Sequence, residues 1–188
     1  RTGEAESMPG VVRILTAGDI PGERVLGLYA KDWPVYVEVG EITRYIGDAL
    51  ACVVAETEAE ARAAAARVKV DYEVLTPLLD MEEAEASPIH IHEHGNILLD
   101  KTIARGEPVD DVLNRCAFTA EATYRTQAVE HAFIEPEAAL AVPEAGGVRL
   151  HVQSQGIWHD KADIAALLHV PTPKVTVTLA DSGGAFGG

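Results

Sequence analysis

The sequence predicts an α/β protein of the mixed α+β kind, built as two successive units. Of its 188 residues, 47% are apolar but only 5% are aromatic, so Ala and Val must supply much of the core. That composition is typical of small-residue helices packed on Val-rich strands. Runs with the period and length of strands and short helices recur along the chain. A stretch with several Pro and Gly residues, residues 76–108, separates the two parts.

The first part begins with a strand and a capped turn. Residues 11–16 follow a Pro-Gly pair and read Val-Val-Arg-Ile-Leu-Thr, which predicts a short strand. Thr16 and Asp19 can then cap a brief helical turn before the break at Pro21. Residues 23–44 are rich in loop-forming residues.

The clearest pattern in the first part is a strand, a helix and a second strand. Residues 49–55 form a continuous apolar run, which is typical of a buried strand. Thr57, with Glu60 three residues later, predicts a capping box at the start of an Ala-rich helix. Residues 68–74 alternate between apolar and polar, which predicts a strand with one buried face. We therefore expect residues 11–80 to form one α/β layer in which the two runs pair in one sheet.

The second part is expected to contain a hairpin, a helix and a further strand. Residues 117–124 alternate in polarity and predict a strand ahead of the hairpin. Turn residues at 143–147 separate two apolar runs, so residues 138–152 predict the hairpin itself. Residues 158–169 carry apolar side chains at helical spacing and end before two prolines. Residues 175–179 predict the last strand, which leads into a Gly-rich loop.

Charge and hydropathy argue against two classes of function. The 30 acidic and 15 basic residues give a formal charge of −15, and so acidic a surface repels phosphate backbones and anionic lipid. No apolar stretch approaches the roughly 20 residues that a membrane-spanning helix needs. The first residues are polar and acidic, unlike a signal peptide. We predict a cytoplasmic protein with neither nucleic acid nor membrane as a partner.

The two cysteines match no disulfide framework and no metal motif. Cys52 lies in an apolar run, and Cys116 is far from it in the sequence. We expect both to be buried, reduced thiols.

The Gly-rich loop is the first candidate ligand site. Residues 183–188 read Gly-Gly-Ala-Phe-Gly-Gly and follow a predicted strand. Glycine lets backbone N–H groups approach a ligand, so successive amides can form a nest for a phosphate, oxo or sulfur group. The loop lacks the Lys and Ser/Thr of a Walker loop and the spacing of the dinucleotide fingerprint. An ordinary turn at a domain edge is the alternative interpretation.

A polar turn is the second candidate. Residues 153–156 read Gln-Ser-Gln-Gly, between a predicted strand and a predicted helix. Amides at such a strand-to-helix turn favour anions. Gln155 can both donate and accept, so it can meet an oxo ligand or a substrate carbonyl. Here too, an ordinary polar turn is the alternative.

Two clusters of titratable residues suggest metal sites, and neither is predicted to be one. Residues 127–137 contain three carboxylates, but their Glu-His pair at 130–131 matches neither an HExxH helix nor a zinc ribbon. We interpret this cluster as polar groups that fix a turn by hydrogen bonding. His90, His92 and His94 would share one face of an extended chain and could bind a divalent cation. The Pro and Gly residues that flank them favour a solvated linker.

Taken in order, six segments resemble the molybdenum-binding subunit of the xanthine dehydrogenase and aldehyde oxidoreductase family. The first three resemble its α/β hammerhead domain, and they are Met8-Pro-Gly-Val to Ile20, Ile46-Gly-Asp to Glu56, and Val70-Asp-Tyr to Leu75. The other three resemble the start of its molybdopterin-binding domain, and they are Tyr124 to Leu140, Gln153-Ser-Gln-Gly156 and Gly183-Gly-Ala-Phe-Gly-Gly188. The ordered set covers nearly the whole chain.

The resemblance implies roles for five residues. Gln155 matches the family's glutamine whose side chain approaches the molybdenum oxo ligand. Gly184, Ala185, Phe186 and Gly187 match the loop whose backbone lies against the molybdenum and its dithiolene cofactor. The family usually has Gly where this chain has Ala185, a small change that still permits close approach.

The resemblance also implies a chemistry and its cofactors. Enzymes of this family hydroxylate a carbon next to nitrogen or oxygen, in an aldehyde or an N-heterocycle, with oxygen from water. Two electrons leave through iron–sulfur clusters and often FAD. The implied partners are the rest of the molybdenum subunit, the iron–sulfur and flavin domains or subunits, and a small-molecule substrate. A homo-oligomer is compatible with the resemblance.

We expect the chain to be an internal fragment of such a subunit. It starts without Met and stops after a Gly-rich turn. The family's catalytic glutamate and most pterin contacts are expected beyond Gly188, and its first hammerhead strands before Arg1. We therefore predict no catalytic residue and no metal ligand in the fragment, no cofactor bound to it, and no activity on its own.

The expected organisation is a partial hammerhead domain over residues 1–85, a linker over 86–108, and the N-terminal part of the molybdopterin-binding domain over 109–188. The main alternative function is a non-catalytic module that keeps the hammerhead fold for protein contacts. A His-rich metal-binding protein, based on residues 90–94, is the third hypothesis. Which substrate the enzyme takes is not predictable from these residues.

Overall fold

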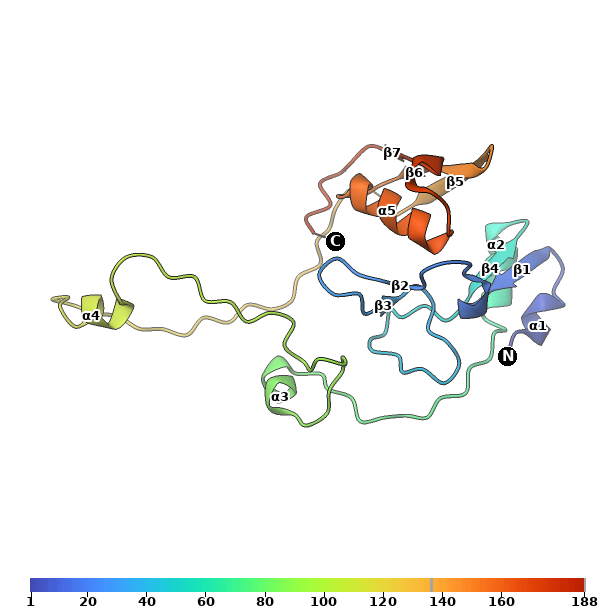
Figure 1. The fold of residues 1–188 in the computed structure, drawn as a ribbon. Helices are drawn as coiled ribbons and strands as arrows, with labels where there is room; N and C mark the ends of the chain where they lie inside the picture. Colours follow the sequence, from blue (N-terminus) through green and yellow to red (C-terminus); the bar gives the residue numbers. More distant parts are fainter. Residues whose placement is uncertain (136, 188) are drawn as a thin grey trace.

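The computed structural model describes residues 1–135 and 137–187 and confirms the α/β class. Two small units lie beside each other, and a long arm extends away from both (Figure 1). The first unit contains α1 (Gly3–Glu6), β1 (Val11–Leu15), η1 (Ala17–Asp19), β2 (Val25–Leu26), β3 (Trp33–Pro34), β4 (Cys52–Ala55) and α2 (Glu58–Ala65). Two short helices follow, α3 (Met81–Ala86) and α4 (Val109–Leu113). The second unit contains β5 (Ala139–Glu144), β6 (Gly147–Val152), α5 (Ile157–Leu167), η2 (Thr172–Lys174) and β7 (Val175–Leu179).

In the first unit, β1 pairs with β4 in an antiparallel two-stranded sheet. The predicted turn after β1 is confirmed, because the Asp19 carboxylate accepts hydrogen bonds from the Thr16 backbone N–H at 2.9 Å and from its hydroxyl at 3.1 Å. The predicted N-cap of α2 is also confirmed, since the Thr57 hydroxyl accepts from the Glu60 N–H at 3.3 Å. The reciprocal bond of the predicted capping box does not form, because the Glu60 carboxylate accepts from that same hydroxyl at 2.7 Å and not from the Thr57 backbone N–H. A small core of Ala5, Ile14 and Ala64 joins α1 and α2 to the sheet.

In the second unit, β5 and β6 form the predicted hairpin, and β7 lies parallel to β6. The helix that joins the two parallel strands, α5, covers one face of this sheet (Figure 1). Leu150, Ala165 and Val175 form the core between them. Because β6 and β7 are parallel, the segments that follow them leave the sheet at the same edge. That edge holds the candidate site.

The two units touch at the end of α5. The Glu23 N–H donates to the Ala166 carbonyl at 3.0 Å. At the preceding residue, Gly22, a Cβ atom would overlap this carbonyl oxygen and lie 2.8 Å from that of Leu167. The backbone approach at this contact therefore requires glycine.

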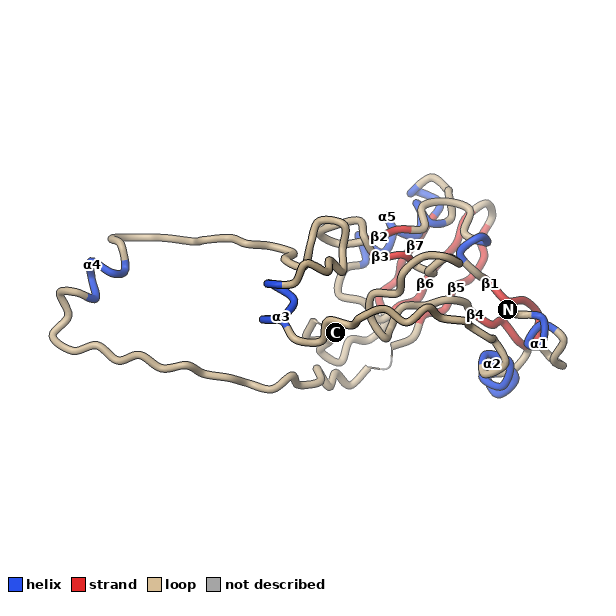
Figure 2. Tube along the Cα trace, turned by 90° about the horizontal axis from the view of Figure 1, so that it is seen from below, coloured by secondary structure: helices blue, strands red, loops and turns tan. Residues whose placement is uncertain are grey.

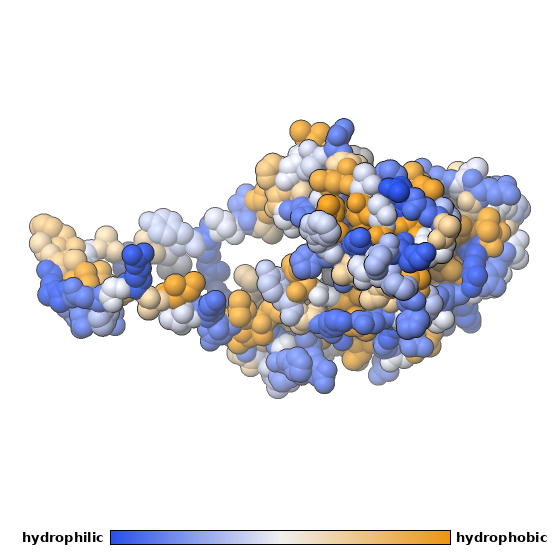
Figure 3. Space-filling view, turned by 45° about the horizontal axis from the view of Figure 1, so that its top comes forward, coloured by the Kyte–Doolittle hydropathy of each residue, from blue (hydrophilic) through white to orange (hydrophobic). Residues whose placement is uncertain are grey.

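The arm, residues 97–134, leaves the α3 region, turns at α4 and returns to β5 (Figure 2). Most of its side chains are exposed, and apolar atoms stand out on its surface (Figure 3). Phe118 is 94% exposed and Tyr124 is 89% exposed. The prediction of a strand over residues 117–124 is wrong, because no segment within residues 1–135 and 137–187 lies beside them to complete a hydrogen-bonded ladder.

The prediction for residues 68–74 is wrong as well. They form no strand, and β4 pairs with β1 instead. The run is held at Lys69, which exchanges two backbone hydrogen bonds with Arg1, at 2.6 and 3.0 Å. An alternating pattern shows that a segment can lie in a sheet, but strand formation also needs a partner.

The predicted buried strand at 49–55 begins later and is less buried than expected. The strand itself is β4, and its side chains alternate between exposed and half-buried. A two-stranded sheet covered by α1 and α2 leaves its other face open. The prediction of two buried thiols is wrong as well, since Cys52 is exposed on β4 and Cys116 is exposed in the arm.

No helix in the described part of the chain is both long and apolar enough to cross a membrane.

Candidate functional site

The candidate site begins where β6 and β7 end side by side. Val152 and Leu179 are partners in the parallel register. One residue further on, the Ala180 N–H donates to the Val152 carbonyl at 2.7 Å. The polar turn after β6 and the Gly-rich loop after β7 therefore start as neighbours, although α5 separates them in the sequence.

The structure brings the two predicted site elements together. The Gly187 N–H donates to Gln155 Oε1 at 3.1 Å. This bond uses the acceptor oxygen of the carboxamide, whose nitrogen is the donor end of the group. The Gln155 side chain is exposed, so the pair forms part of an open wall.

The loop backbone takes an unusual conformation. Gly184, Ala185, Phe186 and Gly187 all have positive φ, at 114°, 51°, 55° and 91°. Such angles are strained for the two non-glycine residues. Ala185 is 2% exposed, whereas Phe186 is 69% exposed. The loop thus packs its small side chain inward and presents its aromatic ring outward.

The loop amides have acceptors within the chain. The Phe186 N–H donates to the Gly184 carbonyl at 2.5 Å, and the Gly184 N–H donates to the Ser182 hydroxyl at 3.4 Å. A nest of the kind expected from the sequence would require these amides to change partners. Of these two bonds, the one from the Gly184 N–H would break more readily, because its length of 3.4 Å lies beyond the normal range for hydrogen bonds.

A buried carboxylate supports the loop from behind. Glu135 is 8% exposed, and its Oε1 accepts from Gln153 Nε2 at 3.1 Å. Burial raises the pKa of Glu135, but its own backbone N–H, the Gln153 amide and the N–H groups of Gly183 and Ala185 together lower that pKa below 4.5. The carboxylate is therefore held ionised at neutral pH.

Glu135 was not among the predicted site residues. The interpretation of residues 127–137 as polar groups that fix a turn is confirmed only in that Glu135 is buried and hydrogen-bonded, because its partner Gln153 lies 18 residues further along the chain and not in a turn. Glu130, His131 and Glu137 are exposed. No local motif marks Glu135, because its partners come from the turn after β6 and from the loop after β7.

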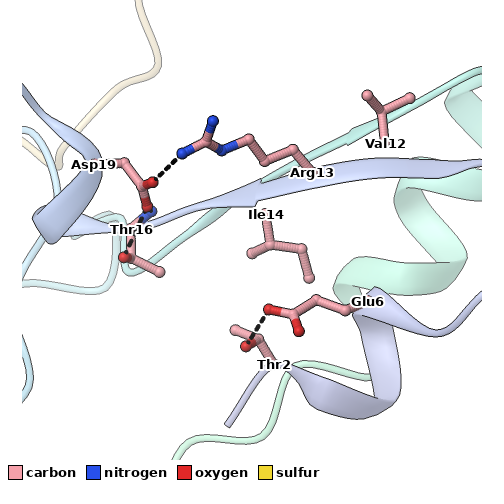
Figure 4. Close-up of a pocket in the computed structure, with 7 residues that line it drawn as sticks. All are labelled: Thr2, Glu6, Val12, Arg13, Ile14, Thr16 and Asp19. Atoms are coloured by element: carbon pink, nitrogen blue, oxygen red, sulfur yellow. Dashed lines mark hydrogen bonds and ion pairs between the residues drawn. The ribbon is translucent and has the colours of Figure 1, made fainter.

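Of two surface hollows, one lies apart from this edge and the other lies beside it. The first, of about 480 Å³, is shown in Figure 4 and is lined by Thr2, Glu6, Val12, Arg13, Ile14, Thr16 and Asp19. Its polar side chains pair with one another, Arg13 with Asp19 at 2.6 Å and Thr2 with Glu6 at 2.7 Å. The second, of about 500 Å³, lies beside Gln153 and includes Leu150, Val152, Ile164 and Val177. Neither includes Gln155 or the loop.

No cluster of three or more His, Cys, Asp or Glu suited to a metal ion occurs in the described part of the chain. His92 Nδ1 lies 2.9 Å from an Asp32 oxygen, within ion-pair distance but without hydrogen-bond geometry. The three histidines of residues 90–94 do not form a metal-binding cluster in the described part of the chain.

The chain matches two protein families in succession. Residues 1–76 match the aldehyde oxidase and xanthine dehydrogenase a/b hammerhead domain, and residues 89–188 match the molybdopterin cofactor-binding domain. A probable xanthine dehydrogenase subunit of Bacillus subtilis (strain 168) is 34% identical over 187 residues, which are 98% of this chain and 25% of that protein. The nicotinate dehydrogenase large molybdopterin subunit of Eubacterium barkeri is 35% identical over 188 residues, covering 98% of this chain and 43% of that protein.

The fold is also similar to that of a solved enzyme. The aldehyde oxidoreductase from Desulfovibrio gigas superposes with a TM-score of 0.88 at 29% identity. That match covers 98% of this chain and 22% of the larger protein. The chain thus spans less than half the length of each of these three proteins.

Proposed function

Because the chain belongs to the family of aldehyde oxidases and xanthine dehydrogenases, we propose that the complete protein that carries it is a molybdenum hydroxylase. It hydroxylates a carbon next to nitrogen or oxygen, in an aldehyde or an N-heterocycle, with oxygen from water. One relative is named for nicotinate and the solved neighbour for aldehydes, so both substrate classes occur among similar proteins.

The contact between Gly187 and Gln155 is the observation that carries the proposal. It joins the two segments that would wall the cofactor, at the edge where parallel strands present ligand-binding groups. We propose that Gln155 donates to an oxo group and that Gly184, Ala185, Phe186 and Gly187 lie against the cofactor. The loop backbone suits close approach, since no Cβ projects at three of its positions, Gly183, Gly184 and Gly187.

The bound molybdopterin would supply the two-electron oxidation of the substrate. This chain would orient that group and hold substrate-facing donors in place. Glu135 cannot serve as a base tuned to neutral pH, because its pKa is lowered and its Oε1 is bonded to Gln153. We expect the general base and the remaining cofactor contacts to come from elsewhere in the complete protein.

The organisation of the enzyme follows from the same proposal. Residues 1–85 form part of the hammerhead domain, 86–108 a linker, and 109–188 the first part of the cofactor-binding domain. Electrons leave through iron–sulfur clusters and FAD on partner domains or subunits. The acidic surface and the two free thiols support a cytoplasmic location.

The substitution Gln155→Ala in the complete protein tests the proposal. Loss of one preorganised donor at a site where charge develops commonly lowers the rate by about 10²–10³-fold. Replacing an exposed polar residue should cost only about 0.5–1 kcal/mol in folding. We therefore expect turnover to fall much more than thermal stability, in enzyme whose molybdenum content is matched to that of the wild type.

Gln127→Ala is the matched control, because Gln127 is an exposed glutamine in the arm. It should leave turnover unchanged. Near-normal turnover in fully loaded Gln155→Ala enzyme would show that Gln155 is an ordinary turn residue. A non-catalytic module, the alternative function, would show no turnover in any variant.

A further inference from the structure

Glu135 is a buried carboxylate for which the proposed chemistry has no use. It is 8% exposed, and burying a charge is unfavourable unless the surroundings compensate it. It precedes β5, yet its contacts lie in the turn after β6 and in the Gly-rich loop. Such a residue needs a structural or functional reason.

The backbone of the loop packs directly on this carboxylate. The Ile134 N–H donates to the Gly183 carbonyl at 3.4 Å. A Cβ atom on Gly183 would overlap Glu135 Oε2 and would lie 2.6 Å from the Glu135 backbone nitrogen. Glycine at 183 therefore lets the start of the loop contact the carboxylate.

The two carboxylate oxygens face different elements. Oε1 accepts from Gln153 Nε2 at 3.1 Å, which ties Glu135 to the end of β6. Oε2 is buried and makes no hydrogen bond of good geometry in the described part of the chain. It lies where the Gly183 backbone passes, and the backbone N–H groups of Gly183 and Ala185 act on the carboxylate together with that of Glu135 itself.

We propose that Glu135 is a positioning residue that fixes the Gly-rich loop against the end of β6, so that Gln155 and the loop face the cofactor together. Its negative charge attracts the loop amides, and Gln153 holds the carboxylate in place. The identity of the cofactor rests on the proposed function, but the anchoring of the loop does not. The lowered pKa of Glu135 is consistent with an ionised anchor.

The substitution Glu135→Gln in the complete protein is the first test. It keeps the shape of the side chain but removes the charge and replaces one acceptor oxygen by an NH₂ donor, so only one terminal atom remains to accept from Gln153 or from the loop amides. We expect hydrogen exchange of the amides at 183–187 to become about tenfold faster, with exchange in β1 and β4 unchanged. We also expect molybdenum to be released about tenfold faster, as when a group that orients a ligand is removed.

Glu137→Gln is the matched control, since Glu137 is exposed two residues along the chain. It should leave both rates at the wild-type value. Gln153→Ala provides a second variant in case Glu135→Gln does not fold, and it should shift both rates in the same direction. Unchanged loop exchange in a folded variant, or faster exchange throughout the protein, would overturn the proposal.

A double variant, Glu135→Gln with Gln153→Glu, distinguishes the contact of Glu135 with Gln153 from its contact with the loop. It preserves a carboxylate–amide bond between the two positions but moves the charge away from the loop. We expect no recovery of loop protection. Full recovery would mean that only the bond between positions 135 and 153 matters, which contradicts the proposed anchor.

The two proposals fail in different ways. If the wild-type protein contains no molybdenum, the proposed function fails, while loop exchange still tests the role of Glu135. If molybdenum is present and Glu135→Gln changes neither rate, the positioning role fails and the proposed function stands.

Discussion

At the scale of single residues, the Gly-rich loop combines strain with burial. Ala185 and Phe186 both have positive φ, which costs of order 1 kcal/mol or more per non-glycine residue. The strain is tolerated because Ala185 is buried and the neighbouring Gly187 is bonded to Gln155. Strain of this kind gathers at ligand sites, where the surrounding structure holds the backbone in one shape.

The pair formed by Arg24 and Glu41 predicts a pH-dependent loop. Arg24 donates to both carboxylate oxygens of Glu41, at 2.8 and 2.6 Å, and to the Tyr36 carbonyl at 2.9 Å. The hydrogen bond from Arg24, followed by that from the Glu38 N–H, lowers the pKa of Glu41 below 4.5. A lowered folded-state pKa stabilises the fold above the unfolded value, and this contribution is lost as pH falls through the folded value.

The expected outcome is a loop over residues 23–41 that is protected from hydrogen exchange at neutral pH and loses protection as the pH falls through the lowered pKa of Glu41. Glu41→Gln should reduce protection at neutral pH and make it nearly independent of pH. Glu121→Gln, in the exposed arm, is the control. A wild-type loop and a Glu41→Gln loop with the same pH profile would contradict this prediction.

Sequence reasoning reached some residues of the site but not others. Gln155 and the loop at 184–187 were predictable because a short local pattern marks them. Glu135 was not, because its partners Gln153 and Gly183 are chosen by the pairing of β6 with β7. A buried contact between distant segments leaves no periodic signal in either segment.

At the scale of elements, residue patterns within a segment predicted the structures that are formed by interactions within that segment. The turn of the β5–β6 hairpin and the helix α5 were both expected from residue spacing. The alternating runs at 68–74 and 117–124 did not become strands, because strand pairing depends on a second segment. The residue pattern shows which secondary structure each segment prefers, but strand pairing depends on which other segment lies beside it in the fold.

The contact between Gly22 and the end of α5 gives a test at this scale. Gly22→Ala should push the loop away from the Ala166 carbonyl and weaken the bond from the Glu23 N–H. Overpacking of this kind typically costs about 1–3 kcal/mol. Gly18→Ala is the matched control, because nothing lies within 4 Å of its added Cβ.

Thermal denaturation and trypsin cleavage after Lys31, in the loop beside this contact, measure the effect. We expect a lower melting temperature and faster cleavage in Gly22→Ala, and wild-type values in Gly18→Ala. Equal behaviour of the two variants would show that the contact between the units contributes little.

At the scale of the whole molecule, composition predicted more core than the described residues form. The apolar fraction of 47% is ample for one packed interior, yet the core consists of two small clusters built around Ile14 and Val175. Many apolar side chains lie exposed, and those of the arm are prominent among them (Figure 3). Composition gives the number of apolar residues but not which of them pack against one another.

The proposed function makes the candidate edge one wall of a larger site. The open geometry at Gln155 and the exposed ring of Phe186 fit a surface that other parts of the complete protein cover. On this account, the isolated 188-residue polypeptide is expected to retain no molybdenum and to oxidise no substrate.

The most direct test of the central claim is the origin of the oxygen that the complete protein adds to its substrate. The purified, molybdenum-loaded protein is given an aldehyde or an N-heterocycle in water labelled with oxygen-18, and the hydroxylated product is analysed by mass spectrometry. The account predicts that the product carries the label from water, and that the isolated polypeptide assayed beside it forms no product. Product that carries oxygen from O₂ instead, or a loaded protein that hydroxylates neither class of substrate, would contradict it.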